Sequence, residues 1–221
     1  MKESDKIIDR LTKKAATKQQ VYRVCKSFFD ILKEVTSELA NKLENEIEDK
    51  YVEVKYLDKG EFEIELKFSG DTLIFHMHTN TFSFEKSHQI WNSSYVKEDK
   101  YRAYCGVINV YNFLSDSFKY NRENDIGFLI GRIFINKDKH FFTDGNGKMS
   151  FLFNDFQNSI LNQEHLVTIV QELMLHAMDF ELMTPPFKEV QVVSVHQIMQ
   201  MSSKMKLKTS KKLGYKFSNE K

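Results

Sequence analysis

Cysteine and proline are scarce in this sequence of 221 residues. Its two cysteines, Cys25 and Cys105, are 80 positions apart, which fits neither a metal-binding finger nor a disulfide framework. Free cysteines are typical of a reducing compartment, so we expect a cytoplasmic protein. The only prolines are the pair Pro185-Pro186, so no proline-rich linker divides the chain.

Long apolar runs and internal repeats are also missing. No window approaches the roughly 18 apolar residues of a membrane span, and the first residues lack the apolar core of a signal peptide. We therefore expect no contact with a membrane. The hydrophobic content of 41%, with 19 phenylalanines, is enough to fill a sizeable core.

Signatures of common catalytic sites are absent. Gly145 and Gly147 lack the lysine, serine and following helix of a phosphate-binding loop. There is no serine nucleophile elbow, and neither cysteine has a plausible triad. His165 and His176 share a helix face without an evident third metal ligand. The sequence favours a non-enzymatic protein.

Charge is sorted along the chain, although the total is only +1. Residues 10–29 hold six cations and no acid, and residues 201–221 hold seven lysines and one glutamate. Each of these ends carries +6, so the remainder carries −11. Two basic ends on an acidic body can attract a polyanion or join two copies of the chain.

Residues 4–49 are predicted to be helical, because apolar residues recur at steps of three and four. One longer gap is followed by Thr17-Lys18-Gln19-Gln20, a capping-box pattern, so one helix and two helices both remain open. Cations fill the first half of the segment and acids dominate the second half. An antiparallel second copy would match these charges, which predicts a homodimer.

Three alternating runs between Tyr51 and Phe84 predict an antiparallel meander with one apolar face. A two-residue loop Gly70-Asp71 and a three-residue loop Asp58-Lys59-Gly60 are expected to set the register. The expected pairs are Phe68 with Leu73, Leu66 with Phe75, Ile64 with Met77, Tyr56 with Phe62, Val54 with Ile64 and Val52 with Leu66.

The rest of the chain adds strands and one helix. The apolar runs 104–113 and 126–135 predict central strands, and Asp144-Gly145-Asn146-Gly147 predicts a hairpin between Phe141-Phe142 and 149–153. Residues 164–180 predict a buried helix, 190–195 a strand and 205–217 a hairpin, while 87–100 stay unassigned.

Together these elements predict an α+β fold. It comprises a long N-terminal helix, an antiparallel sheet of about six or seven strands, and one buried helix from the C-terminal half packed on the sheet. The expected organisation is an N-terminal helical segment (1–50), an α+β core domain (51–200) and a basic C-terminal tail or hairpin (201–221).

Three functions are compatible with these features. The first is a non-enzymatic interaction or regulatory protein that self-associates through the charge-sorted helix. The second is nucleic-acid binding through the basic ends. Its candidate residues are Arg10, Lys13, Lys14, Lys18, Arg23, Lys26, Lys204, Lys206, Lys208, Lys211, Lys212 and Lys216.

The third is a metal-dependent, nuclease-like enzyme. In the expected register, Glu53, Glu65 and His76 form one row across three strands, where carboxylate and imidazole groups can bind a divalent metal ion. Glu65-Leu66-Lys67 also has the spacing of the acid-x-lysine half of a metal-dependent nuclease site. Cross-strand charge pairs on an exposed sheet face are the simpler interpretation of the same residues.

Overall fold

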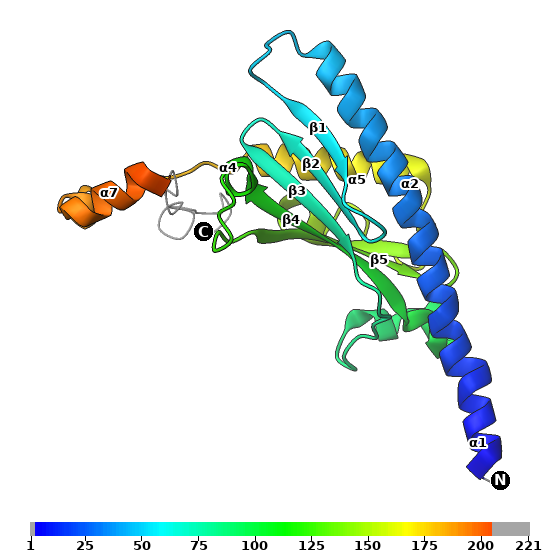
Figure 1. The fold of residues 1–221 in the computed structure, drawn as a ribbon. Helices are drawn as coiled ribbons and strands as arrows, with labels where there is room; N and C mark the ends of the chain where they lie inside the picture. Colours follow the sequence, from blue (N-terminus) through cyan, green and yellow to red (C-terminus); the bar gives the residue numbers. More distant parts are fainter. Residues whose placement is uncertain (1–2, 205–221) are drawn as a thin grey trace.

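The computed structural model describes residues 3–204 and shows an α+β fold. Two helices, α2 and α5, pack on one face of a six-stranded antiparallel sheet with the order β1-β2-β3-β4-β5-β6 (Figure 1). We call the opposite side the outer face. The strands are β1 (Val54–Asp58), β2 (Glu63–Phe68), β3 (Asp71–Met77), β4 (Cys105–Leu114), β5 (Phe128–Asn136) and β6 (Phe141–Gly145).

The N-terminal segment is one unbroken helix. It runs from α1 (Glu3–Arg10) through a π-helical turn, η1 (Leu11–Ala15), into α2 (Ala16–Glu46). The possible cap does not form, because the Thr17 hydroxyl donates to the Lys13 carbonyl at 2.8 Å inside the helix. The apolar stripe of α2 lies against the sheet, whereas α1 extends beyond it (Figure 1).

The register between β2 and β3 differs from the expected one by two residues. Phe68 pairs with Asp71 and Leu66 with Leu73, so the two-residue loop is Ser69-Gly70. Ser69 itself takes the left-handed conformation (φ 52°), which closes the turn one residue early. A shift of two keeps every side chain on its expected face, because side chains alternate with period two.

The register between β1 and β2 differs by four residues, since Tyr56 pairs with Leu66. The turn is longer than expected and is held by α2. The Lys33 ammonium lies 2.9 Å from the Asp58 carboxylate and 2.6 Å from the Gly60 carbonyl oxygen. Asp58 in turn accepts the backbone N–H of Gly60. Only the folded position of α2 supplies this lysine, so the local sequence did not reveal the loop length.

The main core lies between the sheet and the pair α2 and α5. Helix α5 (Gln163–Met178) confirms the predicted buried helix, and the Asn162 side chain caps it by accepting the His165 N–H at 2.8 Å. At Gly106 in β4, a Cβ would lie 2.7 Å from both Cβ and Sγ of Cys25, so glycine permits this close approach. Both cysteines are buried and unpaired, and burial raises the pKa of the Cys25 thiol to about 12.

The chain after β6 departs from two predictions. The expected strand 149–153 is absent, because Gly147 (φ 57°) leads into the 3₁₀ turn η4 (Gly147–Ser150). The expected strand 190–195 is also wrong. The outer edge of β6 is occupied, because the Phe141 N–H donates to the Ser159 carbonyl, and within residues 3–204 no strand pairs with residues 190–195.

Residues 190–195 instead link two short helices, α6 (Phe187–Val190) and α7 (Val195–Lys204), which stand away from the body (Figure 1). The predicted hairpin 205–217 lies outside the described residues. Short helices α3, α4, η2 and η3 complete the fold, at Ser94–Glu98, Ser115–Lys119, Gln89–Asn92 and Lys100–Ala103. No helix in the described part of the chain combines the length and apolar character needed to cross a bilayer.

Candidate functional site

A groove of about 1220 Å³ lies on the outer face of the sheet, over β4, β5 and β6. Outward side chains of these strands form its floor, and residues 78–93 and 150–157 form its two walls. The walls are the polar, irregular segments that follow β3 and β6. The floor residues are Val107, Asn109, Arg132, Phe134, Phe142 and Asp144.

Aromatic rings form a continuous array in this groove. Phe134 and Phe142 are stacked with ring centroids 4.9 Å apart. Phe84 from one wall lies 5.3 Å from Phe134, and Phe156 from the other wall lies 5.5 Å from Phe142. Phe84 and Phe142 are half-buried, so the array offers apolar surface to a bound molecule.

Two histidines in the same wall are held in a defined tautomer. Nδ1 of His78 accepts the Asn80 N–H at 3.0 Å, and Nδ1 of His88 accepts the Ile90 N–H at 3.2 Å. A neutral imidazole that accepts at Nδ1 carries its proton on Nε2. Both Nε2–H groups are therefore hydrogen-bond donors in the groove lining.

An ion pair between Arg132 and Asp144 spans β5 and β6 on the groove floor. The Arg132 guanidinium also lies over the Phe134 ring, 5.2 Å from its centroid. With Glu85 and Asp155 in the walls, the lining has three acids and one cation when both histidines are neutral. The groove is thus aromatic and mildly acidic, which suits an apolar ligand with positive charge.

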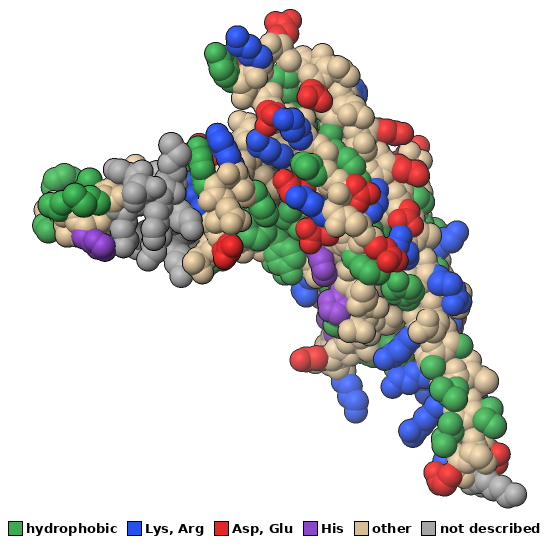
Figure 2. Space-filling view, in the orientation of Figure 1, with side chains coloured by type: hydrophobic (Ala, Val, Ile, Leu, Met, Phe, Trp, Pro, Cys, Tyr) green, Lys and Arg blue, Asp and Glu red, His purple; other side chains and the backbone are tan. Residues whose placement is uncertain are grey.

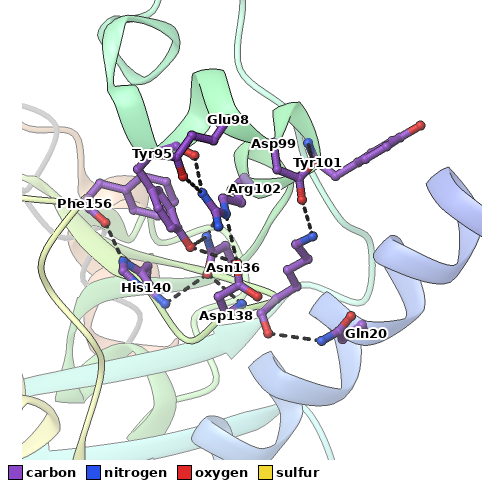
Figure 3. A network of polar contacts seen from close by, with 11 residues as sticks. Gln20, Tyr95, Glu98, Asp99, Tyr101, Arg102, Asn136, Asp138, His140 and Phe156 are labelled. Atoms are coloured by element: carbon purple, nitrogen blue, oxygen red, sulfur yellow. Dashed lines mark hydrogen bonds and ion pairs between the residues drawn. The ribbon is translucent and has the colours of Figure 1, made fainter.

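A polar network anchors the segment that backs this groove (Figure 3). The Asn136 amide donates to the Tyr95 hydroxyl at 3.0 Å, and that hydroxyl donates to Asp138 at 3.0 Å. The Tyr95 ring lies between the Arg102 guanidinium, 4.3 Å from its centroid, and the stacked His140 imidazole, also at 4.3 Å. Burial raises the pKa of Tyr95, so its hydroxyl stays a neutral hydrogen-bonding group.

The same network reaches the N-terminal helix (Figure 3). The Lys137 ammonium lies 2.5 Å from Asp99, and the Gln20 side chain of α2 donates to the Lys137 carbonyl at 3.5 Å. The polar contacts of the network join residues 94–103 to β5, to the β5–β6 turn and to α2. We therefore assign the network to positioning of residues 94–103.

The three residues predicted as a metal site do not form one row. Glu53 pairs with Lys55 and Lys67, and hydrogen bonds from these lysines hold its pKa at about 2. Glu65 pairs with Leu57 and Ile74 across the strands and lies 3.0 Å from the Lys59 ammonium.

His76 lies opposite Glu63, because of the register shift. Over β1 and β2 acids and cations are interspersed (Figure 2). Within residues 3–204, no group of three or more His, Cys, Asp or Glu side chains is arranged to hold a metal ion.

The cations predicted to bind nucleic acid are distributed around the N-terminal helix. Lys13 pairs with Asp9 at 2.5 Å, and Lys26 pairs with Asp30 at 2.5 Å. Arg10 and Arg23 are exposed. Lys204 ends α7, and the lysines at 206, 208, 211, 212 and 216 lie outside the described residues.

Two of the predicted cations share an aromatic partner. The ammoniums of Lys14 and Lys18 lie 5.9 and 5.7 Å from the centroid of the Tyr104 ring. Tyr104 stacks on Tyr101, whose ring carries the Lys100 ammonium at 5.6 Å. We call these five residues the basic-aromatic patch. Figure 2 shows cations gathered along this lower part of the helix.

A smaller hollow of about 360 Å³ lies between η4 and α5. Lys148 and Glu172 form an ion pair of 3.0 Å at its edge, and His176 lines it. Burial lowers the pKa of His176, and its Nε2 is buried without a hydrogen-bond partner. These groups do not include a nucleophile held by a base.

The groove was not anticipated from the sequence. Its residues come from five separate segments, and the register of β5 and β6 places Phe134 and Phe142 side by side on one face. No model of a known protein family matches the chain, and no curated protein or solved structure matches it significantly. The function is therefore argued from the surface features of the chain itself.

Proposed function

We propose that this protein is a non-enzymatic interaction protein that acts as a homodimer, self-associating through its N-terminal helix. The exposed apolar surface of α1 and η1 carries the proposal. No residue of α1 is buried, and the exposed fractions of Ile7, Ile8 and Leu11 are 58%, 59% and 60%. They continue the stripe that α2 buries against the sheet, at a place where no other part of residues 3–204 covers them (Figures 1 and 2).

The charges around these side chains favour an antiparallel second copy. Glu3 and Asp5 begin the helix, whereas Lys13 and Lys14 lie on the far side of the apolar group. An antiparallel pair that sets Ile7 beside Leu11 of the second copy also brings the acids of one copy to the lysines of the other. A parallel pair would set like charges together.

The helix contact by itself yields a weak dimer. Burying six side chains that are each about 60% exposed contributes about 5 to 11 kcal/mol. Association costs about 4 to 15 kcal/mol in lost freedom of motion. We therefore expect a dissociation constant in the micromolar range or weaker, unless a second surface joins the interface.

Analytical ultracentrifugation of the full chain over a range of concentrations tests this proposal. Leu11→Glu should shift the chain to monomer, whereas Gln19→Glu, which adds the same charge on the exposed side of α2, should leave association unchanged. Asp5→Lys and Lys13→Asp should each weaken the dimer, and the double variant should restore it. A wild-type chain that stays monomeric at high micromolar concentration and low salt refutes the proposal.

A second candidate function is binding of single-stranded nucleic acid, favoured by the basic-aromatic patch. Lysines next to stacked tyrosines are the combination that contacts phosphates and bases. If phosphates are contacted, log affinity should fall linearly with log salt, and Lys18→Glu should flatten the slope. Lys42→Glu, near the other end of α2, is the matched control. Absence of binding to RNA and DNA at low salt removes this candidate.

A further inference from the structure

We infer that the groove on the outer face binds the basic C-terminal residues 205–217 of a second copy of this chain. This inference rests on the proposed self-association and supplies the second surface that the helix contact requires. It identifies the ligand class of the groove as a lysine-rich segment with apolar and aromatic side chains.

The first observation is the exposed arm that carries this tail. Between the end of α5 and Lys204, the chain leaves the body and forms α6 and α7, and every residue from 187 to 199 is exposed (Figure 1). Its apolar side chains are exposed and are not packed against the rest of the described chain. The exposed large apolar residues are Leu182, Met183, Phe187, Val190, Val192, Val193, Val195, Ile198 and Met199.

The position of the arm favours a second copy over the same chain. Helices α6 and α7 stand away from the body of their own subunit, so a neighbouring copy can contact the arm without a rearrangement of the fold (Figure 1). Exchange between two copies brings each tail to the other body. It also lets apolar side chains of the arm contact the second copy.

Charge complementarity supports this occupant. Residues 205–217 contain five lysines and no acid, so they carry +5. Glu85, Asp144 and Asp155 line the groove against the single cation Arg132. Glu85 and Asp155 are exposed at the walls, where each can pair with a lysine of the bound segment.

The apolar and hydrogen-bonding groups fit the same segment. In an extended conformation, Leu213, Tyr215 and Phe217 project to one side, which would meet the aromatic floor, while Lys212 and Lys216 project to the other side. The Nε2–H groups of the two groove histidines can donate to backbone carbonyls of the segment. At about 1220 Å³, the groove exceeds the space of a drug-sized molecule and accommodates several residues.

Disulfide trapping between two single variants of the full chain tests the inference. One variant is Asn154→Cys, at an exposed position in the groove lining, and the other is Ser210→Cys, in the middle of the tail sequence. The native cysteines are buried, so they do not compete. We expect a mixture of the two variants, one carrying a size tag, to yield a mixed covalent dimer on a non-reducing gel. Asn41→Cys, exposed on α2, mixed with Ser210→Cys is the control and should yield only background.

Charge reversal separates specific docking from chance collision. The pair Glu85→Lys and Asp155→Lys, added to the groove variant, should lower the trapping yield about tenfold. Glu34→Lys and Glu38→Lys, on the exposed side of α2, should leave it unchanged.

Each alternative outcome has a defined meaning. If ultracentrifugation shows a dimer but groove and tail do not cross-link above the control, the groove inference is overturned and self-association stands. If the chain is monomeric and does not cross-link, both are overturned. If a chain with both cysteines forms only an internal disulfide, the tail occupies its own groove, and the exchange between copies is overturned.

Discussion

Replacing Asn112 with leucine is expected to stabilise this protein. Asn112 lies in β4 opposite Leu73 of β3, on the face that packs against α2 and α5. Its side chain is completely buried, and neither the oxygen nor the nitrogen of its amide has a hydrogen-bond partner. Folding therefore removes this amide from water without compensation.

The expected gain follows from the cost of that burial. An unpaired buried polar group costs about 1 to 3 kcal/mol in proteins, and leucine adds apolar burial of similar size. Leucine is somewhat larger than asparagine, and crowding of the core offsets part of the gain. We expect the free energy of unfolding to rise by about 1 to 3 kcal/mol, which raises the melting temperature of a chain of this length by about 2 to 12 °C.

Urea unfolding followed by circular dichroism measures the change, and a second buried asparagine supplies the control. Asn136 is also completely buried, but its amide donates to Tyr95 and to the Arg102 carbonyl at 3.0 and 3.2 Å. Its oxygen accepts the N–H groups of Asp138 and His140, both at 2.9 Å. Asn136→Leu should lower the free energy of unfolding by about 2 to 5 kcal/mol, because four partners are lost.

Opposite signs for these two substitutions are the essential result. If Asn112→Leu destabilises the protein by more than about 1 kcal/mol, the amide of Asn112 has a partner in solution and the reasoning is wrong. Equal losses for both variants would show that volume, and not hydrogen bonding, decides the outcome at these positions.

Three further substitutions test packing, titration and the polar network. Gly106→Ala should lower the free energy of unfolding measured in urea by about 1 to 3 kcal/mol, because the new Cβ meets Cys25 at 2.7 Å, whereas Gly70→Ala, with no atom within 4 Å, should be nearly neutral. Burial lowers the pKa of His176 below 6.5, so the neutral imidazole contributes fully to stability above pH 6.5, and this contribution is lost as the pH falls through the lowered pKa. His176→Gln should therefore reduce the loss of unfolding free energy measured between pH 7.5 and pH 5. Tyr95→Phe removes a hydroxyl that bridges two side chains of the β5–β6 turn and should cost about 1 kcal/mol in thermal unfolding.

The fold class was predicted from the sequence because its signals are periodic. The long helix, the antiparallel sheet and α5 each rest on many residues that repeat an apolar pattern, so single errors do not matter. Where one residue decided the outcome, prediction failed. Ser69 in a left-handed conformation and the contact of Lys33 with the β1–β2 turn displaced the two registers by two and four residues.

The candidate site depended on those registers. Register shifts of two and four residues kept every side chain on its expected face but separated Glu53, Glu65 and His76. Side chains form a row across strands only when the exact pairing partners are right, whereas the face of each side chain depends only on whether the shift is even or odd. The groove could not be predicted, since its walls are irregular segments that carry no periodic signal.

The sequence by itself determined which side chains of the long N-terminal helix and of strands β1 to β3 face the core, the segregation of charge into two basic ends, and the absence of a catalytic motif. These are properties of local order along the chain. Only the tertiary structure decided that Ile7 and Leu11 extend past the sheet, that two walls enclose an aromatic groove, and that residues 190–195 become an exposed arm and not a strand. Those outcomes depend on which surfaces remain uncovered after packing, and that is a property of the whole chain.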